Sequence, residues 1–213
     1  LKKGAKHMSG TPTLRPWQNK AMDKLSESWQ IGPDAKTLIA ASPGAGKTWF
    51  SVVAAQQAIK DFGIDLVVVV SPSVSIKEQW RETFQNAGIK AHARADNEAL
   101  RFRIDHGINP TEDWRAICVT YSQLSRDAEL FVEVARRKRV LLIADEVHHA
   151  DDKECYGRAL EQLSEFVQLR LALSGTPFNS TGGALAMCPS IEDLDETGRA
   201  IRRAKPLFTY SYG

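Results

Sequence analysis

Apolar residues recur along this chain with two different periods, and segments of the two kinds alternate. Trp17, Ala21, Leu25 and Trp29 repeat every fourth position, as one face of a helix does. Residues 66–70 are instead a leucine followed by four valines, which is typical of a strand buried on both faces. The expected strands cover 37–41, 66–70, 90–94, 116–121, 140–144, 169–173 and 207–212, and the expected helices cover 15–29, 47–62, 74–86, 97–106, 127–138 and 153–166.

This alternation predicts an α/β fold in which crossover helices join mostly parallel strands into a three-layer α/β/α arrangement. In open sheets of this kind, ligands bind at the carboxyl ends of the strands. The residues that directly follow each expected strand are therefore the first candidates for function.

The pattern weakens towards both ends of the chain. We expect residues 1–12 to form a flexible tail, with the main domain over residues 13–177. Residues 178–204 look loop-like, with a helix at 193–203 as the one regular element expected there.

Composition narrows the class of protein without naming a function. Hydrophobic residues make up 43% and charged residues 25% of the 213 positions, close to the averages of soluble globular proteins, which excludes a disordered or collagen-like chain. The 28 basic and 26 acidic residues leave a net charge of only +2. A global positive field for holding nucleic acid is therefore absent, although a local basic patch remains possible.

The cysteines and the apolar segments of the sequence indicate in which cellular compartment the protein works. Cys118, Cys155 and Cys188 have neither metal-ligand nor redox spacing, and their odd number argues against a disulfide framework. The longest apolar runs are too short to span a bilayer, and no apolar segment follows the N-terminal lysines as in a secretory signal. We expect a protein of the reducing cytoplasm that makes no contact with membranes.

Residues 41–48 read Ala-Ser-Pro-Gly-Ala-Gly-Lys-Thr, between an expected strand and an expected helix, and fit a phosphate-binding loop with alanine in place of its first glycine. In such a loop, consecutive backbone N–H groups and a helix N-terminus surround an anion. Lys47 would reach the β- and γ-phosphates, and the Thr48 hydroxyl would bind Mg²⁺. The loop itself would be formed by Pro43, Gly44, Ala45 and Gly46. The alternative is a glycine-rich turn that merely starts a helix.

Residues 145–148 read Asp-Glu-Val-His and close another expected strand. Two adjacent carboxylates there are costly, because burial disfavours their charge. In a nucleotide site, Asp145 would hold Mg²⁺ through water, and Glu146 would orient and deprotonate the attacking water. We expect His148 to couple this motif to its surroundings and His149 to have no special role. The alternative is a helix N-terminus enriched in acids.

A third motif, Ser-Gly-Thr-Pro, occupies residues 174–177 after a further strand. The hydroxyls of Ser174 and Thr176 could hydrogen-bond both to the acidic motif and to a bound γ-phosphate. A plain turn is the alternative.

These three motifs, in this order, resemble the first RecA-like lobe of superfamily 2 helicases and translocases. The Asp-Glu-Val-His motif, together with Ser-Gly-Thr-Pro-Phe, is most similar to DNA-directed helicases akin to restriction-enzyme helicase subunits and phage helicases. The resemblance covers about residues 13–177. It implies a RecA-like P-loop NTPase fold, ATP and Mg²⁺ as ligands, and a bacterial or phage-type protein. The implied partner is a nucleic acid, and the resemblance favours DNA over RNA without deciding between them.

The resemblance also assigns roles to residues outside the three motifs. Gln18, in Arg-Pro-Trp-Gln, would hydrogen-bond the adenine edge, with the polar face of an amphipathic helix as the alternative. The expected nucleic-acid contacts, which would touch backbone phosphates, are Ser71, Pro72, Gln79, Thr120 and Tyr121. Ser71 and Pro72 could instead cap a helix, and Trp80 fits a core position better than a base-stacking one.

The chain departs from the family's pattern in two places. Gly175 stands where many relatives have alanine, a change that only removes a methyl group. The 36 residues after Pro177 are too few for a second RecA-like lobe, so 178–213 would end this lobe and begin an interlobe linker. The second lobe supplies an arginine finger worth about 10³–10⁵ in rate. The isolated chain should therefore bind nucleotide weakly and hydrolyse it slowly.

Other functions remain open at this stage. One is a P-loop motor that moves or remodels a partner without unwinding, such as a restriction or chromatin-type translocase. A kinase would need a substrate lid and a GTPase an Asn-Lys-x-Asp element, and the sequence shows neither. A non-enzymatic binding domain fits poorly with an intact phosphate loop and acidic motif. A basic stripe formed by Arg94, Arg101, Arg103 and His106 is conceivable, but a solvated helix face is the preferred interpretation.

Overall fold

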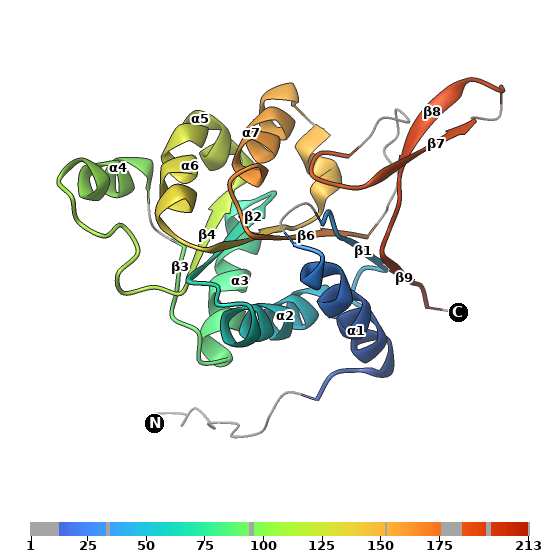
Figure 1. Ribbon diagram of the computed structural model, residues 1–213, viewed down its shortest axis with the longest axis horizontal. Helices are drawn as coiled ribbons and strands as arrows, with labels where there is room; N and C mark the ends of the chain where they lie inside the picture. The colour runs from blue at the N-terminus through green and yellow to red at the C-terminus, as the bar shows by residue number, and fades with distance from the viewer. Residues whose placement is uncertain are drawn as a thin grey trace.

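A seven-stranded parallel sheet forms the centre of the protein (Figure 1). The computed structural model describes residues 13–32, 35–93, 96–151, 153–175, 185–194 and 197–212. The strand order is β3-β4-β2-β5-β6-β1-β9, and every neighbouring pair is parallel. The strands are β1 (Leu38–Ala41), β2 (Leu66–Ser71), β3 (Ala91–His92), β4 (Ala116–Thr120), β5 (Val140–Ala144), β6 (Leu169–Ser174) and β9 (Phe208–Tyr210).

Helices cover both faces of this sheet, which gives the expected three layers (Figure 1). One face carries α1 (Pro16–Gln30), α2 (Lys47–Asp61) and α3 (Val74–Asn86). The other carries α4 (Asn97–Asp105), α5 (Tyr121–Arg126), α6 (Ala128–Arg137) and α7 (Glu154–Ser164). The predicted α/β class with a mostly parallel sheet is confirmed.

The valine run of β2 shows why the strands read as continuous apolar segments. Val67 and Val69 pack in the core that α1, α2 and α3 cover, whereas Val68 and Val70 pack in the core beneath α5, α6 and α7. Because successive side chains of a strand point to opposite faces, a strand covered on both sides needs an apolar residue at every position.

Side-chain caps fix where several helices begin. The Ser73 hydroxyl accepts a hydrogen bond from the Ile76 N–H at the start of α3, and the Asp127 carboxylate accepts one from the Leu130 N–H at the start of α6. Thr120 does the same for α5, a short helix that the sequence pattern does not predict. Strand β4 therefore ends at Thr120, one residue earlier than expected.

The helix expected at 193–203 is wrong, because an antiparallel hairpin lies there. Strands β7 (Ser190–Leu194) and β8 (Ala200–Ala204) pair in this hairpin, which projects from the body of the domain (Figure 1). Gly198 at the turn has a φ of 80°, which glycine adopts readily and a helix does not allow. Opposite charges also pair across the strands, with Arg203 Nε 3.2 Å from Asp193 Oδ2.

The strand order determines which loops can meet. Because β6 lies between β5 and β1, the segments that follow these three strands emerge side by side at one edge of the sheet. Within the described ranges, no helix combines the length and the apolar character that crossing a membrane would require.

Candidate active site

The phosphate loop, the acidic motif and the turn after β6 meet at this edge. Lys47 Nζ lies 3.1 Å from Glu146 Oε1. The Gly175 N–H donates to the other carboxylate oxygen, Glu146 Oε2, at 2.8 Å. One side chain thus connects three segments that are far apart in the sequence.

The backbone of the phosphate loop depends on its glycines. Gly44 and Gly46 have φ values of 75° and 94°, in the left-handed region that favours glycine. The Ala45 N–H closes the turn on the Ser42 carbonyl at 3.1 Å. Gly46 caps α2 without contributing a side-chain hydrogen bond, so the first N–H groups of α2 remain available to an anion.

Lys47 is held between the loop and the acidic motif. Only 8% of the residue is exposed, and its ammonium also donates to the Ala41 carbonyl at 2.9 Å. A buried charge requires partners, and Glu146 supplies the opposite charge. Thr48, the next residue of α2, is partly exposed at the same edge.

Asp145 is buried and held from two sides. Its Oδ2 accepts a hydrogen bond from the indole N–H of Trp80 at 2.7 Å, and its backbone carbonyl accepts one from the Tyr121 hydroxyl at 3.1 Å. Burial raises the pKa of Asp145 from 3.8 to about 6, although the hydrogen bond from Trp80 opposes the rise. Burial also raises the pKa of Tyr121 well above 10, so its hydroxyl stays a donor.

Glu146 is one of two described non-glycine residues with positive φ, here 46°. Such strain costs about 1–3 kcal/mol and is typical of functional sites. With this backbone conformation, the Glu146 carboxylate contacts Lys47 and the Gly175 N–H.

His148 lies in the 3₁₀ helix η1 (Val147–Asp151) and reaches the end of β6. Its Nδ1 is 3.1 Å from the Ser174 hydroxyl and 3.6 Å from Glu146 Oε2. These contacts connect the acidic motif to the end of β6, and the coupling role itself stays a prediction. Thr176, the other residue expected to couple, lies outside the described residues.

Gln18 is buried against the phosphate loop, which does not fit the alternative of an exposed polar helix face. Its Nε2 donates to the Gly46 carbonyl at 3.0 Å, and its Oε1 accepts from the Arg15 N–H at 2.8 Å. The adenine role stays a prediction.

The residues expected to touch nucleic acid divide into two groups. The side chains of Ser71 and Tyr121 are buried, and the Ser71 hydroxyl donates to the Val119 carbonyl at 3.2 Å, so neither offers surface to a ligand in this conformation. Pro72, Gln79 and Thr120 are exposed or partly exposed. The cap of α3 is Ser73, not Ser71 or Pro72.

The conceivable basic stripe on α4 is not supported by the described residues. Arg101 donates from Nη2 to both carboxylate oxygens of Asp127 at 2.8 Å, which neutralises it and joins α4 to α6. Arg103 donates to the Asn109 carbonyl, and Arg94 lies outside the described residues.

Sequence reasoning missed three contacts at the site. Trp80 is in the core as expected, but its hydrogen bond to Asp145 was not foreseen. Arg15 donates to the Ala45 carbonyl at 3.2 Å, and the Tyr212 hydroxyl donates to the Gly44 carbonyl at 3.0 Å. No spacing signals these contacts, because the sheet brings together residues that are 30 to 168 positions apart.

Alanine at Gly46 and at Gly175 should have different effects. A methyl group at Gly46 would lie 3.0 Å from Gln18 Nε2 on a left-handed backbone, whereas one at Gly175 would make contacts of 3.5 Å or more. We expect Gly46→Ala to lower the free energy of unfolding by about 1–2 kcal/mol and Gly175→Ala to change it by less than about 0.5 kcal/mol. Urea denaturation of both variants measures this, and equal effects would contradict the loop geometry.

Removing the indole N–H should raise the pKa of Asp145 above 6. We expect this in Trp80→Phe, because the carboxylate loses its main hydrogen-bond donor. A carbon-13 NMR titration of the metal-free protein would follow the carboxyl group. Trp114→Phe, next to His92, is the matched control. An unchanged or lower pKa in Trp80→Phe would refute the stated cause.

The raised pKa of Asp145 also has a consequence for stability. The folded protein retains a proton that the unfolded chain releases near pH 4, so this group's stabilising contribution is complete below pH 4 and is lost as the pH rises through 6.

The chain is similar to one protein family and to several known proteins. The sequence pattern of the type III restriction enzyme res subunit family matches residues 11–179. An uncharacterized protein of Mycobacterium tuberculosis is 27% identical over 204 residues, and the match covers 94% of this chain and 31% of that protein. One from Mycobacterium leprae is 27% identical over 199 residues, covering 93% and 31%. The chain thus spans about a third of the length of these relatives.

Solved structures share the fold. The Sulfolobus solfataricus SWI2/SNF2 ATPase core in complex with dsDNA matches with a TM-score of 0.59 and 21% identity, over 78% of this chain and 32% of that one. The ATP-dependent type ISP restriction-modification enzyme LlaBIII bound to DNA matches with a TM-score of 0.60 and 15% identity, over 91% of this chain and 14% of that one. The UvsW helicase from Bacteriophage T4 matches with a TM-score of 0.51 and 16% identity, over 79% of this chain and 55% of that one.

The resemblance drawn from the three motifs is therefore confirmed. The chain belongs to the type III restriction enzyme res subunit family, and it has the RecA-like fold of the helicase and translocase structures named above.

Proposed function

We propose that this chain is the ATP–Mg²⁺-binding lobe of a helicase or translocase that acts on DNA. The observation that carries the proposal is the meeting of Lys47, Glu146 and the Gly175 N–H at the carboxyl ends of adjacent strands. A phosphate-loop lysine and a carboxylate that can orient water, both at the same edge of the sheet, are groups that phosphoryl transfer to water uses.

The loop fits the triphosphate of ATP. The N–H groups at the start of α2 would bind phosphate oxygens, and the Lys47 ammonium would move from Glu146 to the β- and γ-phosphates. Gln18, packed on the Gly46 carbonyl, is placed beside the loop, where it would select adenine.

The oxygen donors nearby fit Mg²⁺, which binds few protein ligands besides phosphates and water. Thr48 would supply a hydroxyl, and Asp145 a carboxylate acting through water. The bound ion would neutralise charge on the phosphates. A cation next to Asp145 favours its ionised form, so the raised pKa does not prevent this role.

Glu146 would act as the general base. In the present geometry one oxygen is paired with Lys47 and the other accepts from the Gly175 N–H. Once Lys47 turns to phosphate, the released oxygen can accept a proton from the attacking water. His148 and Ser174 would transmit this change to β6.

Full activity would need a second RecA-like lobe from the same parent protein. An arginine finger contributes about 10³–10⁵ in rate in related NTPases. We therefore expect this chain alone to hydrolyse ATP slowly.

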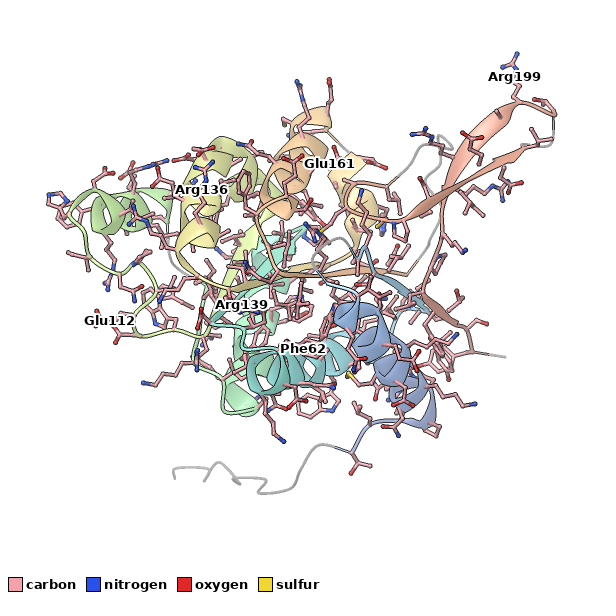
Figure 2. All side chains as sticks on the ribbon, in the orientation of Figure 1. Phe62, Glu112, Arg136, Arg139, Glu161 and Arg199 are labelled. Carbon is pink, nitrogen blue, oxygen red and sulfur yellow. The ribbon has the colours of Figure 1, made fainter. Side chains whose placement is uncertain are left out.

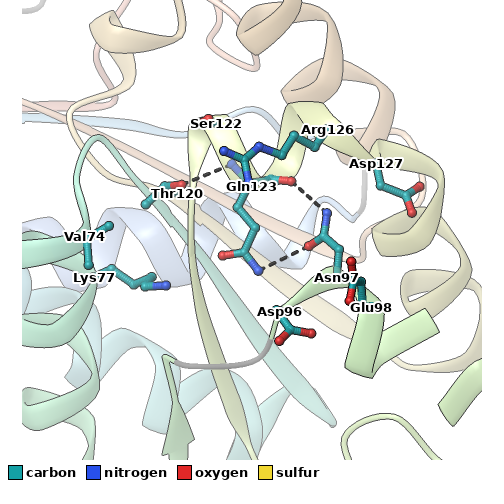
Figure 3. Close-up of a pocket in the computed structure, with 10 residues that line it drawn as sticks. All are labelled: Val74, Lys77, Asp96, Asn97, Glu98, Thr120, Ser122, Gln123, Arg126 and Asp127. Carbon is teal, nitrogen blue, oxygen red and sulfur yellow. Dashed lines mark hydrogen bonds between the residues drawn. The ribbon is translucent and has the colours of Figure 1, made fainter. Parts of the chain in front are cut away.

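A cavity of about 630 Å³ at the same edge of the sheet is a candidate track for the DNA backbone (Figure 3). It lies where β4 ends and α3 begins, and Thr120 is part of its wall. Lys77 and Arg126 are the basic residues of its lining, which also contains the carboxylates of Asp96, Glu98 and Asp127, so only the part of the wall near the two cations suits a phosphate. In its wall, Asn97 and Gln123 exchange hydrogen bonds, which join α4 to α5 (Figure 3).

Two of the solved relatives have DNA bound, and one of them is named as a complex with dsDNA. This favours DNA as the partner. It also supports the second candidate function, a motor that moves along duplex DNA without unwinding it.

Replacing Lys47 should abolish nucleotide binding. We expect Lys47→Ala to remove detectable binding of an ATP analogue, and the unchanged protein to prefer ATP over GTP analogues. Isothermal titration calorimetry measures both. Lys60→Ala, an exposed lysine later on α2, is the matched control. Binding retained in Lys47→Ala with an intact fold would refute the phosphate site.

Neutralising the cavity's cations should weaken DNA binding in a salt-dependent way. We expect Lys77→Ala with Arg126→Ala to lower the slope of log K against log salt by about 2, roughly one for each lost phosphate contact. Fluorescence anisotropy with labelled DNA measures this. Lys20→Ala on α1 is the control, and an unchanged slope in the double variant would place the track elsewhere.

A further inference from the structure

Three side chains from outside the phosphate loop donate hydrogen bonds to three consecutive carbonyls of the loop. The Tyr212 hydroxyl donates to the Gly44 carbonyl at 3.0 Å, Arg15 Nη1 to the Ala45 carbonyl at 3.2 Å, and Gln18 Nε2 to the Gly46 carbonyl at 3.0 Å. We call Arg15, Gln18 and Tyr212 the carbonyl clamp.

The clamp determines which way the loop's N–H groups point. In a trans peptide the C=O and the following N–H point in opposite directions. Donors that hold the three carbonyls outwards therefore turn the N–H groups of Ala45, Gly46 and Lys47 away from the clamp. The Ala45 N–H closes the turn on the Ser42 carbonyl. The N–H groups of Gly46 and Lys47 lie where an anion would bind.

The loop needs such support because two of its four residues, Gly44 and Gly46, restrict the backbone little. Gly44 and Gly46 adopt left-handed conformations, and glycine has more backbone freedom to lose than any other residue. A loop fixed before binding does not spend binding energy on becoming ordered.

Tyr212 is positioned by packing as well as by its hydroxyl. Its ring meets Tyr210 edge-on with centroids 5.5 Å apart, and Tyr210 stacks on Trp17 at 5.0 Å. Strand β9 pairs with β1, and the Ser42 N–H donates to the Tyr210 carbonyl at 3.1 Å. The Tyr212 hydroxyl also accepts from Arg15 at 3.5 Å.

We propose that Tyr212, supported by Arg15, is a positioning residue that holds the phosphate loop in its anion-binding form. The segment after β9 thereby controls nucleotide affinity, since a shift of this segment withdraws one of the three donors. Tyr212 is 55% exposed, so it can leave the loop without opening the core. This inference rests on the proposed function, because the ligand of the loop is taken to be a nucleotide phosphate.

The test compares Tyr212→Phe with Tyr210→Phe in the full chain. Each variant loses only a phenolic oxygen, and among the described residues the Tyr210 hydroxyl makes no hydrogen bond. Calorimetry would measure the affinity for ADP and for pyrophosphate, both with Mg²⁺. Tyr212→Phe should weaken both ligands by a similar factor of about threefold to tenfold, the range expected for one neutral hydrogen bond. Tyr210→Phe should stay within about twofold.

Two results would overturn the clamp. Weaker binding of ADP with unchanged pyrophosphate binding would mean that Tyr212 contacts the base or sugar instead. Unchanged binding of both ligands would mean that Tyr212 does not position the loop.

A second measurement separates this inference from the proposed function. If the unaltered protein binds neither ligand, the proposed function fails, but amide exchange in the ligand-free protein still tests the clamp. Exchange at the Ala45 N–H should be faster in Tyr212→Phe than in Tyr210→Phe, because the turn it closes loses its support. Equal exchange in the two variants would overturn the clamp.

Discussion

The ion pair between Lys47 and Glu146 is the contact on which the arrangement of the site depends. It forms because β6 separates β1 from β5 in the sheet, so that the loops after all three strands emerge together. Each charge would be costly alone in this partly buried place, and together with the Gly175 N–H they satisfy one another. An anionic ligand would take the place of Glu146 as the partner of Lys47. Binding of the ligand would then leave one carboxylate oxygen of Glu146 without its ion pair.

Around this pair, much of the core acts as support for the site. Trp80 and Tyr121 fill the two core layers and also hold Asp145, one by its side chain and the other by its backbone. The same two side chains therefore fill the core and orient Asp145. Trp17 also combines packing with support, because it stacks on Tyr210, whose ring in turn contacts that of Tyr212.

The sequence predicts most of the fold, because doubly covered strands and amphipathic helices leave clear periodic patterns. Helix α3 and strand β5 match their predicted bounds. The sequence favours a helix at 193–203 because the charged residues there occur at spacings that also suit a helix. Only the pairing of β7 with β8 in the folded protein distinguishes the hairpin from that helix. Helix α5 is too short to show a period.

For the site, local motifs identify Lys47, Asp145 and Glu146, since each lies next to a strand end. Partners such as Trp80, Arg15 and Tyr212 depend on the tertiary fold and carry no local signal. Burial likewise removes the side chains of Ser71 and Tyr121 from the exposed surface in this structure, which no motif indicates.

The most direct test of the account is a crystal structure of this chain with ADP and Mg²⁺. The account predicts that the diphosphate lies on the N–H groups of Gly46 and Lys47, and that Lys47 Nζ leaves Glu146 for a phosphate oxygen. A nucleotide bound elsewhere, or one bound with the Lys47–Glu146 pair intact, would contradict it.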